Sequence, residues 1–324
     1  MTERSLRDAV RAALADELRS DDRVFLLGED IAQAGGVFKA TVGLVDEFGA
    51  ERVRDTPISE VAIIGAATGA ALTGMRPVVD LMFADFAAVA FDQIVNQAAK
   101  HRYLTGGQCD VPLTIRMANG AGAGFGAQHS QSVDSWLYGT AGLLVVAPAT
   151  PADAYGLLRS SIQEPNPVVF LEHKAMYGLT GAVRDPPAAV PLGKARIARE
   201  GDAVTVVASQ LMVHRALDAS ELLAEEGISV EVVDLRTIWP PDLTTIATSV
   251  QKTGRIVVVE EATPAGGWSS ALIVDVLDAV FDHLDAAPQR VTGDPTPIPY
   301  AAALEAAWMP DAARIAARIR STVV

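Results

Sequence analysis

The hydrophobic pattern of the chain opens with a helix near residue 6. Apolar residues recur at intervals of three and four from Leu6 to Leu18, which is the spacing of an amphipathic helix. Ser5 and Asp8 are placed like the two members of a capping box at its start. We therefore predict a helix that begins directly after Ser5.

Beyond this helix, short apolar segments alternate with longer helical stretches. The short segments largely lack polar alternation, which is typical of strands buried on both faces of a parallel sheet. They are Val24–Leu27, Pro77–Leu81, Pro112–Ile115, Leu143–Val146 and Val168–Leu171, and the helical stretches between them are 61–74, 87–103 and 151–163. This order predicts an α/β domain.

A boundary follows this first domain. Residues 178–193 hold so many glycines and prolines that we predict a linker there, without a helix or strand. The alternation then restarts, with strands at 203–208, 230–234 and 256–260 and helices at 212–226, 241–250 and 268–284. We therefore expect two α/β domains, residues 1–185 and residues 186–324, whose sheets are doubly wound or mixed.

Composition narrows the class of protein. Half of the 324 residues are apolar, and 26 basic against 40 acidic side chains give a net charge of −14. The apolar content predicts a chain that folds, and the negative charge predicts repulsion of the phosphates of nucleic acid. The single cysteine, Cys109, and a start without an apolar segment favour a reducing, cytoplasmic location. The uncharged run Val61–Met75 is too short to span a membrane and predicts a buried helix.

Glu60 is the first candidate for chemistry. It follows Asp55–Ser59 and directly precedes the apolar helix predicted from residue 61. One interpretation is an acid that stabilises the helix dipole. The other is a partly desolvated carboxylate whose raised pKa lets it exchange a proton near neutral pH. The apolar residues that follow favour the second interpretation.

A glycine-rich loop carries the second candidate. Residues 119–127 contain four glycines, and His129 follows them in a polar segment. The stretch Gly122–Ala127 formally satisfies GxGxxA, but it lies in mid-domain and has no acidic residue about 20 positions later, so nicotinamide binding is disfavoured. A loop that folds over a ligand is favoured, with His129 serving in acid–base or oxyanion chemistry. Neither an HExxH nor a Walker A sequence occurs, which disfavours zinc and P-loop chemistry.

Several segments, taken together and in order, carry a resemblance to one enzyme family. They are Leu27–Asp30, Arg54–Glu60, Phe83–Phe86, Asp92–Asn96, Ala98–Lys100, Gly106–Gly107, Gly126–Gln131 and Pro297–Tyr300. With these segments the chain resembles the beta chain of the thiamine-diphosphate-dependent, decarboxylating first component of 2-oxo acid dehydrogenase complexes, including acetoin dehydrogenases. The resemblance covers essentially the whole chain and implies a thiamine-diphosphate pyrimidine-binding fold followed by a transketolase C-terminal-like domain.

The resemblance implies roles for individual residues. Glu60 matches the glutamate that hydrogen-bonds the aminopyrimidine ring of the cofactor, and Phe86 matches the aromatic residue that packs on this ring. Glu29 matches an acidic residue near the same site. His129 matches a histidine that faces the reacting carbon and serves proton transfer. The main chain around Leu113, Ser161, Glu164 and Asn166 matches a structural potassium site of some members.

The resemblance also implies partners. In this superfamily a GDG motif grips the magnesium-diphosphate end of the cofactor, and the Gly-Asp pairs Gly201-Asp202 and Gly293-Asp294 do not fit it. An alpha chain is therefore expected to supply these Mg²⁺ ligands, most simply in an alpha2-beta2 heterotetramer. The expected activity is decarboxylation of a 2-oxo acid and acyl transfer to a lipoyl-bearing acyltransferase component.

Two departures leave the substrate open. Gly139–Leu144 stands where the family often has His-x-Pro-Gly-Leu-Lys, and Asp80 stands where many members have Glu. These changes permit a specialised donor in place of the usual short 2-oxo acid, an acyloin such as acetoin, or a carboligation in place of lipoyl transfer. A hypothesis of another class is a non-catalytic assembly subunit, which the retained Glu60, Phe86 and His129 argue against.

Overall fold

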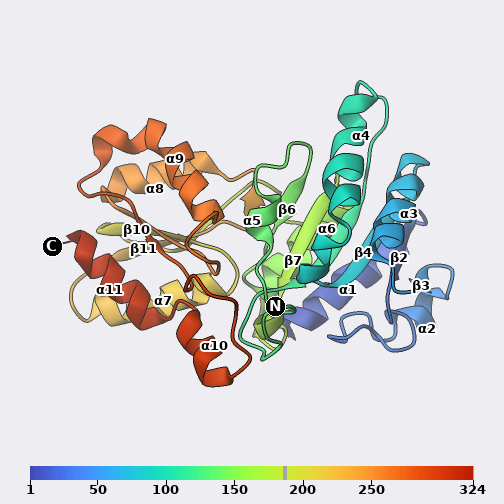
Figure 1. The fold of residues 1–324 in the computed structure, drawn as a ribbon, viewed down its shortest axis with the longest axis horizontal. Coiled ribbons are helices and arrows are strands. Elements are labelled where there is room, and N and C mark those ends of the chain that lie inside the picture. Colours follow the sequence, from blue (N-terminus) through green and yellow to red (C-terminus); the bar gives the residue numbers. More distant parts are fainter. Residues whose placement is uncertain (185–187, 324) are drawn as a thin grey trace.

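The computed structural model describes residues 1–184 and 188–323. These residues form two α/β domains (Figure 1), and one apolar core contains residues of both. The first helix, α1 (Leu6–Ser20), begins as predicted, because the Ser5 hydroxyl accepts a hydrogen bond from the Asp8 backbone N–H at 3.1 Å. The helix continues from β1 (Thr2–Ser5), which the sequence pattern did not indicate.

The first domain is built on a seven-stranded sheet with the order β12-β6-β7-β5-β4-β2-β3. Six of these strands run parallel, and the edge strand β12 is antiparallel to β6. The strands are β2 (Val24–Gly28), β3 (Val53–Asp55), β4 (Arg76–Phe83), β5 (Thr114–Asn119), β6 (Leu144–Val146), β7 (Val168–His173) and β12 (Thr237–Trp239). The predicted parallel sheet is thus present, with β12 contributed by the second half of the chain.

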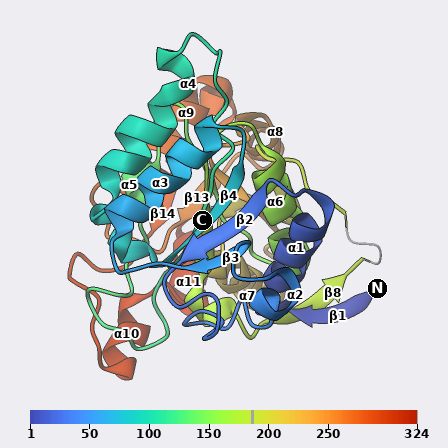
Figure 2. The same cartoon turned by 90° about the vertical axis from the view of Figure 1, so that its right-hand side faces the viewer.

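Helices cover both faces of this sheet, which explains its continuous apolar strands. Val168 and Phe170 of β7 point towards α1 and α6 (Pro151–Gln163), whereas Val169 and Leu171 pack on the opposite face. Figure 2 shows the helices of this opposite face, α3 (Glu60–Leu72) and α4 (Ala99–Leu104), on the far side of β2 and β4 from α1 and α6. The short helices α2 (Leu44–Phe48) and α5 (Asp134–Leu137) lie in connections.

The second domain carries a five-stranded sheet with the order β14-β13-β10-β11-β9. Its strands are β9 (Arg196–Arg199), β10 (Val204–Ala208), β11 (Val230–Asp234), β13 (Ile256–Val259) and β14 (Gln289–Val291), and only β9 is antiparallel. The helices are α7 (Leu211–Ala224), α8 (Leu243–Thr253), α9 (Trp268–Val280), α10 (Ala302–Trp308) and α11 (Ala312–Val323). The two sheets confirm the predicted pair of α/β domains.

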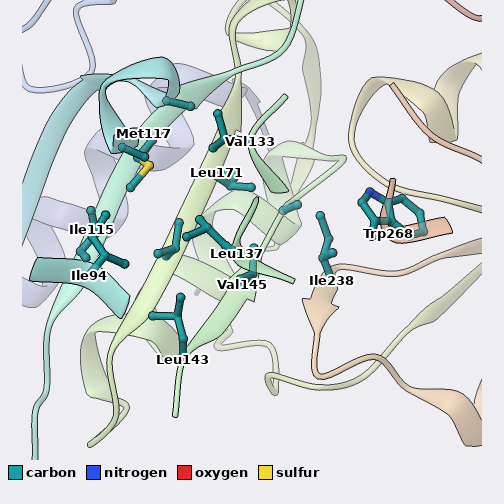
Figure 3. Packing of buried hydrophobic residues seen from close by; sticks show 14 of the residues in the cluster. Ile94, Ile115, Met117, Val133, Leu137, Leu143, Val145, Leu171, Ile238 and Trp268 are labelled. Atoms are coloured by element: carbon teal, nitrogen blue, oxygen red, sulfur yellow. The ribbon is translucent and has the colours of Figure 1, made fainter. Parts of the chain in front are cut away.

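One apolar core joins the two domains. Figure 3 shows Ile238 and Trp268 from the second half of the chain beside Leu137 and Val145 of the first. The indole N–H of Trp268 donates to Asp134 at 3.0 Å. The second domain is therefore packed directly against the sheet that carries the candidate site.

Three local predictions were wrong. The predicted linker 178–193 includes a strand, β8 (Thr180–Val183), which pairs antiparallel with β1 and is stabilised by this distant partner. The predicted helix 87–103 is divided into 3-10 turns at Ala84–Ala88, a π-helical segment at Gln93–Ala98 and α4. The apolar helix α3 is only half buried, since Val61 is 44% exposed. The predicted domain boundary falls on residues 185–187, outside the described residues, and stays a prediction.

No helix within residues 1–184 and 188–323 is long and apolar enough to cross a membrane. Two further 3-10 turns, Lys174–Met176 and Phe281–His283, complete the described elements.

Asp134, at the junction between the two domains, is expected to make the free energy of unfolding depend on pH. Burial, followed by the charge of Glu260, raises the pKa of Asp134 from 3.8 to about 7. The unfolded chain ionises this group from about pH 4 upward, so its ionisation destabilises the fold progressively as the pH rises from 4 to 7. Asp134→Asn, which keeps an acceptor for Trp268, should raise the free energy of unfolding at pH 8 by an amount on the order of 2–4 kcal/mol.

Urea denaturation of both proteins at pH 4 and pH 8 measures this effect. The difference between variant and wild type should shrink towards zero near pH 4. An equal difference at both pH values would show that Asp134 does not titrate as described.

Candidate active site

The candidate residues lie at the carboxyl edge of the seven-stranded sheet. Glu29 directly follows β2, and Glu60 begins α3 after β3. Phe86 lies in the turn after β4, and His129 lies in the glycine-rich loop after β5. Because these strands are parallel, their carboxyl ends meet at one edge, which is where open α/β sheets bind ligands.

Glu60 is a buried carboxylate at a helix N-terminus. It is the first residue of α3, is 9% exposed, and receives no side-chain hydrogen bond from the described residues. Its charge acts on Glu29, whose pKa is raised first by burial and then by Glu60. The opposing influence is a hydrogen bond from the Ser59 backbone to Glu29. The negative charge of Glu60 therefore makes ionisation of Glu29 less favourable.

The rings of Phe38, Phe83, Phe86 and His129 form an aromatic wall that reaches the cavity beside Glu29. The His129 ring stands edge-on to Phe83 at 4.9 Å and to Phe86 at 5.4 Å between centroids. Phe83 also contacts Phe38 at 5.4 Å, and Phe38 lines a small cavity together with Glu29. The predicted residues are thus connected, Glu29 to Glu60 by their charges and Phe86 to His129 by ring contact.

This arrangement suits a flat heteroaromatic ligand. An aromatic wall offers stacking surface, and a buried carboxylate without a protein partner offers an acceptor for a protonated ring nitrogen. Glu60 and Phe86 therefore fit the pyrimidine end of thiamine diphosphate.

A buried ionic cluster under Glu29 was not indicated by the sequence pattern. Arg116 donates to both carboxylate oxygens of Glu172, at 2.6 and 2.9 Å, and to Asp80 at 3.0 Å. Asp80 also accepts from the backbone N–H of Met82, which has a φ of 60°. This bond holds the irregular end of β4 from which Phe83 and Phe86 project. Only Asp80 among these groups stood out in the sequence, as a departure from the family.

His173 and Lys174, beside the start of the loop that carries His129, are a second buried group that the sequence analysis did not single out. His173, which sequence reasoning treated as one of several scattered histidines, is buried with its Nε2 2.8 Å from Glu261 Oε2. Its neighbour Lys174 lies with Nζ 5.7 Å from the Phe83 ring centroid, and burial lowers the pKa of this lysine to about 8. The signal that would have found them is their position directly after an apolar strand.

The residues matched to a potassium site lie at the opposite edge of the sheet. The Leu113 carbonyl, just before β5, accepts from the Val168 N–H at 2.9 Å, and the Ser161 carbonyl accepts from the Glu164 N–H at 3.3 Å. The Asn166 amide donates to Glu164 at 2.6 Å. The four residues are thus brought near one another at the amino ends of β5 and β7. Within the described ranges, no three His, Cys, Asp or Glu side chains cluster as metal ligands.

An apolar surface adjoins Glu60. Ile58 is 83% exposed, and the outer face of α3 exposes Val61 with the small residues Ala62, Ala66 and Gly69. Val89, after the Phe86 turn, is also exposed. Glu60 therefore adjoins an exposed apolar face, the kind of surface at which protein interfaces form.

The comparisons with known proteins agree with this geometry. Residues 2–180 match the family described as "Transketolase, pyrimidine binding domain", and residues 193–315 match "Transketolase, C-terminal domain". A solved structure titled "Split gene transketolase, inactive beta4 tetramer" has a TM-score of 0.79 over 98% of both chains at 24% identity, and shows the fold alone.

Curated relatives are more similar in sequence. The chain is 45% identical to the pyruvate dehydrogenase E1 component subunit beta-2 of Oryza sativa, over 95% of this chain and 83% of that protein. It is 44% identical to the corresponding subunit of Rhizobium meliloti, over 99% and 70%. It is 45% identical to the acetoin:2,6-dichlorophenolindophenol oxidoreductase subunit beta of Cupriavidus necator, over 98% and 97%.

The fold and the matched domains define a transketolase-like chain of two α/β domains. Within this class, the chain belongs to the family of beta subunits of pyruvate dehydrogenase E1 and acetoin dehydrogenase enzymes. The resemblance and the fold expected from the sequence are thereby confirmed.

The loop that carries His129 gives a test of local geometry. Gly120 has a φ of 86°, and a Cβ atom there would overlap the His173 ring, whereas Gly124 has a φ of 73° and open space. Gly120→Ala combines backbone strain with overpacking and should lower the free energy of unfolding by about 2–5 kcal/mol. The control Gly124→Ala, which adds strain alone, should cost about 1 kcal/mol. Equal losses in urea denaturation would contradict the close packing of Gly120 on His173.

Proposed function

We propose that the chain is the beta subunit of a heteromeric thiamine-diphosphate-dependent 2-oxo acid dehydrogenase. It decarboxylates a 2-oxo acid and passes the acyl group to a lipoyl group of an acyltransferase component. The observation that carries the proposal is Glu60, a buried carboxylate without a side-chain partner in the described chain, next to an exposed apolar face. Membership of the beta-subunit family supports it.

Each site residue has a role in this proposal. Glu60 shares a proton with the pyrimidine ring nitrogen, and its burial strengthens this hydrogen bond. Phe86 packs on the ring and fixes its orientation. Glu29 lies at the same edge, and burial together with the charge of Glu60 raises its pKa. His129 holds or moves a proton near the reacting carbon of the substrate. When bound, thiamine diphosphate supplies the electron sink for decarboxylation.

The proposed alpha subunit follows from the cofactor contacts that this chain lacks. We assign the Mg²⁺ and diphosphate contacts to an alpha subunit, because the sequence departs from the GDG motif at both Gly-Asp pairs. The apolar outer face of α3 supports docking of this subunit against Glu60, and an alpha2-beta2 heterotetramer is the assembly we expect. Potassium at the carbonyls near Leu113, Ser161, Glu164 and Asn166, and a cytoplasmic location, belong to the same proposal.

A second candidate substrate is an acyloin. The Cupriavidus necator relative, named for acetoin, matches this chain over 97% of its own length at 45% identity. Gly139–Leu144 and Asp80 are the departures from the family pattern that permit this alternative to a short 2-oxo acid. Carboligation remains a variant of the same chemistry.

The remaining hypotheses are weaker. A non-catalytic assembly subunit would not need to keep Glu60, Phe86 and His129, the three residues that match cofactor and catalytic positions of the family. A nicotinamide site on the glycine-rich loop would need the loop N–H groups for phosphate. Those of Ala121, Gly122 and Gly124 already bind carboxylates.

The test is turnover by the reconstituted enzyme. The chain is mixed with its cognate alpha subunit, thiamine diphosphate and Mg²⁺, and decarboxylation of pyruvate is compared for wild type, Glu60→Gln and the exposed control Glu51→Gln. Loss of the proton-sharing carboxylate should reduce turnover by about 2–4 kcal/mol, or roughly 30- to 1,000-fold. The control should match wild type.

Undiminished turnover by Glu60→Gln would defeat the assigned role. The same assay with acetoin and a dye as electron acceptor separates the two candidate substrates, since the true one gives the higher kcat/KM.

A further inference from the structure

We propose that Glu261 and Glu305 of the second domain are positioning residues for His129. They bind the backbone of the loop 120–132 and thereby fix the place of His129 against Phe83 and Phe86. The inference rests on the proposed function only for the importance of His129 in turnover.

Glu305 binds the middle of the loop. It lies in α10, is 4% exposed, and accepts hydrogen bonds from the backbone N–H groups of Gly122 at 2.9 Å and Gly124 at 3.1 Å. Both glycines have positive φ angles, which let alternate N–H groups of the loop converge on one carboxylate. In the described part of the chain, no lysine or arginine forms an ion pair with Glu305.

Glu261 binds both ends of the loop. Its Oε1 accepts from the Ala121 N–H at 2.6 Å and from the Ser132 hydroxyl at 3.3 Å, and its Oε2 meets His173 at 2.8 Å. Burial opposes its ionisation, but the charge and hydrogen bonds of its neighbours hold the pKa of Glu261 below its usual value. This carboxylate is therefore charged and ties residues 121 and 132 to one point of the second domain.

The first domain contributes a smaller share of the contacts. Asp85 accepts from the Gln131 N–H at 3.2 Å, and Asn119 accepts from the Val133 N–H at 3.0 Å. Lys174 lies in the field of Asp85, Glu261 and Glu305, and its Nζ donates to the Ala118 carbonyl at 3.3 Å. The buried Lys174 side chain thus lies among the negative charges of these three carboxylates at the base of the loop.

The hydrogen bonds of Glu261 and Glu305 explain how a glycine-rich loop can hold His129 in place. A loop with glycines at 120, 122, 124 and 126 loses much conformational entropy when ordered. Charge-assisted hydrogen bonds to the backbone offset this loss and are stronger than neutral ones. Because most of them come from residues 140 to 183 positions away in the sequence, docking of the second domain determines where His129 lies.

Hydrogen exchange tests the contacts without any assay of activity. We expect slow exchange of the hydrogen-bonded amides of Ala121, Gly122 and Gly124 in the wild-type chain with its alpha subunit. Glu305→Ala should speed exchange of Gly122 and Gly124 at least tenfold while exchange in α1 is unchanged, and the exposed control Glu225→Ala should match wild type. Unchanged exchange of Gly122 and Gly124 in Glu305→Ala would overturn the proposal.

A second variant guards against misfolding of the first. Oε1 of Glu305 accepts from Gly122 at 2.9 Å and from Gly124 at 3.4 Å, whereas Oε2 accepts from Gly124 alone at 3.1 Å. Glu305→Gln keeps one acceptor oxygen, so it should leave the Gly122 amide protected and speed exchange of Gly124 more than that of Gly122. An equal change at the two amides, or a larger change at Gly122, would contradict this assignment of the oxygens.

A double-mutant cycle separates positioning from a merely structural role. Glu305→Ala should lower kcat at least tenfold in the reconstituted enzyme, yet lower it less than twofold further when His129 is already Ala. Losses that multiply in the double variant would show that Glu305 does not act through His129. Lack of 2-oxo acid turnover by wild type would count against the proposed function, and the exchange result would then decide this inference alone.

Discussion

A buried carboxylate must be paired with a cation, hydrogen-bonded or shared with a ligand, because burial of an isolated charge is costly. Most buried acids of this protein are paired or bonded: Glu172 binds Arg116, and Glu261 binds His173 and the Ala121 N–H. Glu60 has no side-chain partner among the described residues and lies at a helix start beside an exposed apolar face. This contrast is the reason to expect a bound cofactor and a second chain at this position.

The rest of the fold serves to hold groups around that carboxylate. The parallel sheet places four consecutive connections at one edge, so residues 29, 60, 86 and 129 lie at the same edge although they are far apart in the sequence. The Arg116 cluster fixes the end of β4, and the second domain grips the loop of His129. The C-terminal half of the chain therefore contributes to the site through Glu261 and Glu305, whose carboxylates bind backbone N–H groups of the loop. Among the described residues, it adds no ring to the aromatic wall of Phe38, Phe83, Phe86 and His129.

The sequence predicted the elements whose signals are local. The Ser5 cap, the Pro151 helix start and the apolar strands were all recognisable because each depends on nearby residues. Strand β8 was missed because it depends on β1, which is about 175 residues away, and β12 was missed because it completes a sheet of the other domain. The half-exposed face of α3 was also missed, since an apolar helix looks the same whether its partner is the core or another chain.

The candidate site is only partly accessible from the sequence. Glu60 and His129 were candidates from their local sequence, Glu29 and Phe86 were added by the resemblance, and the fold brings all four to one edge. Glu305 could not be assigned, because no spacing reveals a carboxylate that binds glycine N–H groups some 180 positions earlier. Such contacts become visible only once the two domains are packed together.

The most direct measurement is an experimental structure of this chain with its alpha subunit, thiamine diphosphate and Mg²⁺. We expect a Glu60 carboxylate oxygen within about 2.6–3.2 Å of a pyrimidine ring nitrogen, with Phe86 against the ring and the diphosphate held by the alpha subunit. A cofactor bound elsewhere, with Glu60 facing bulk solvent or paired to a cation of the partner, would contradict the account.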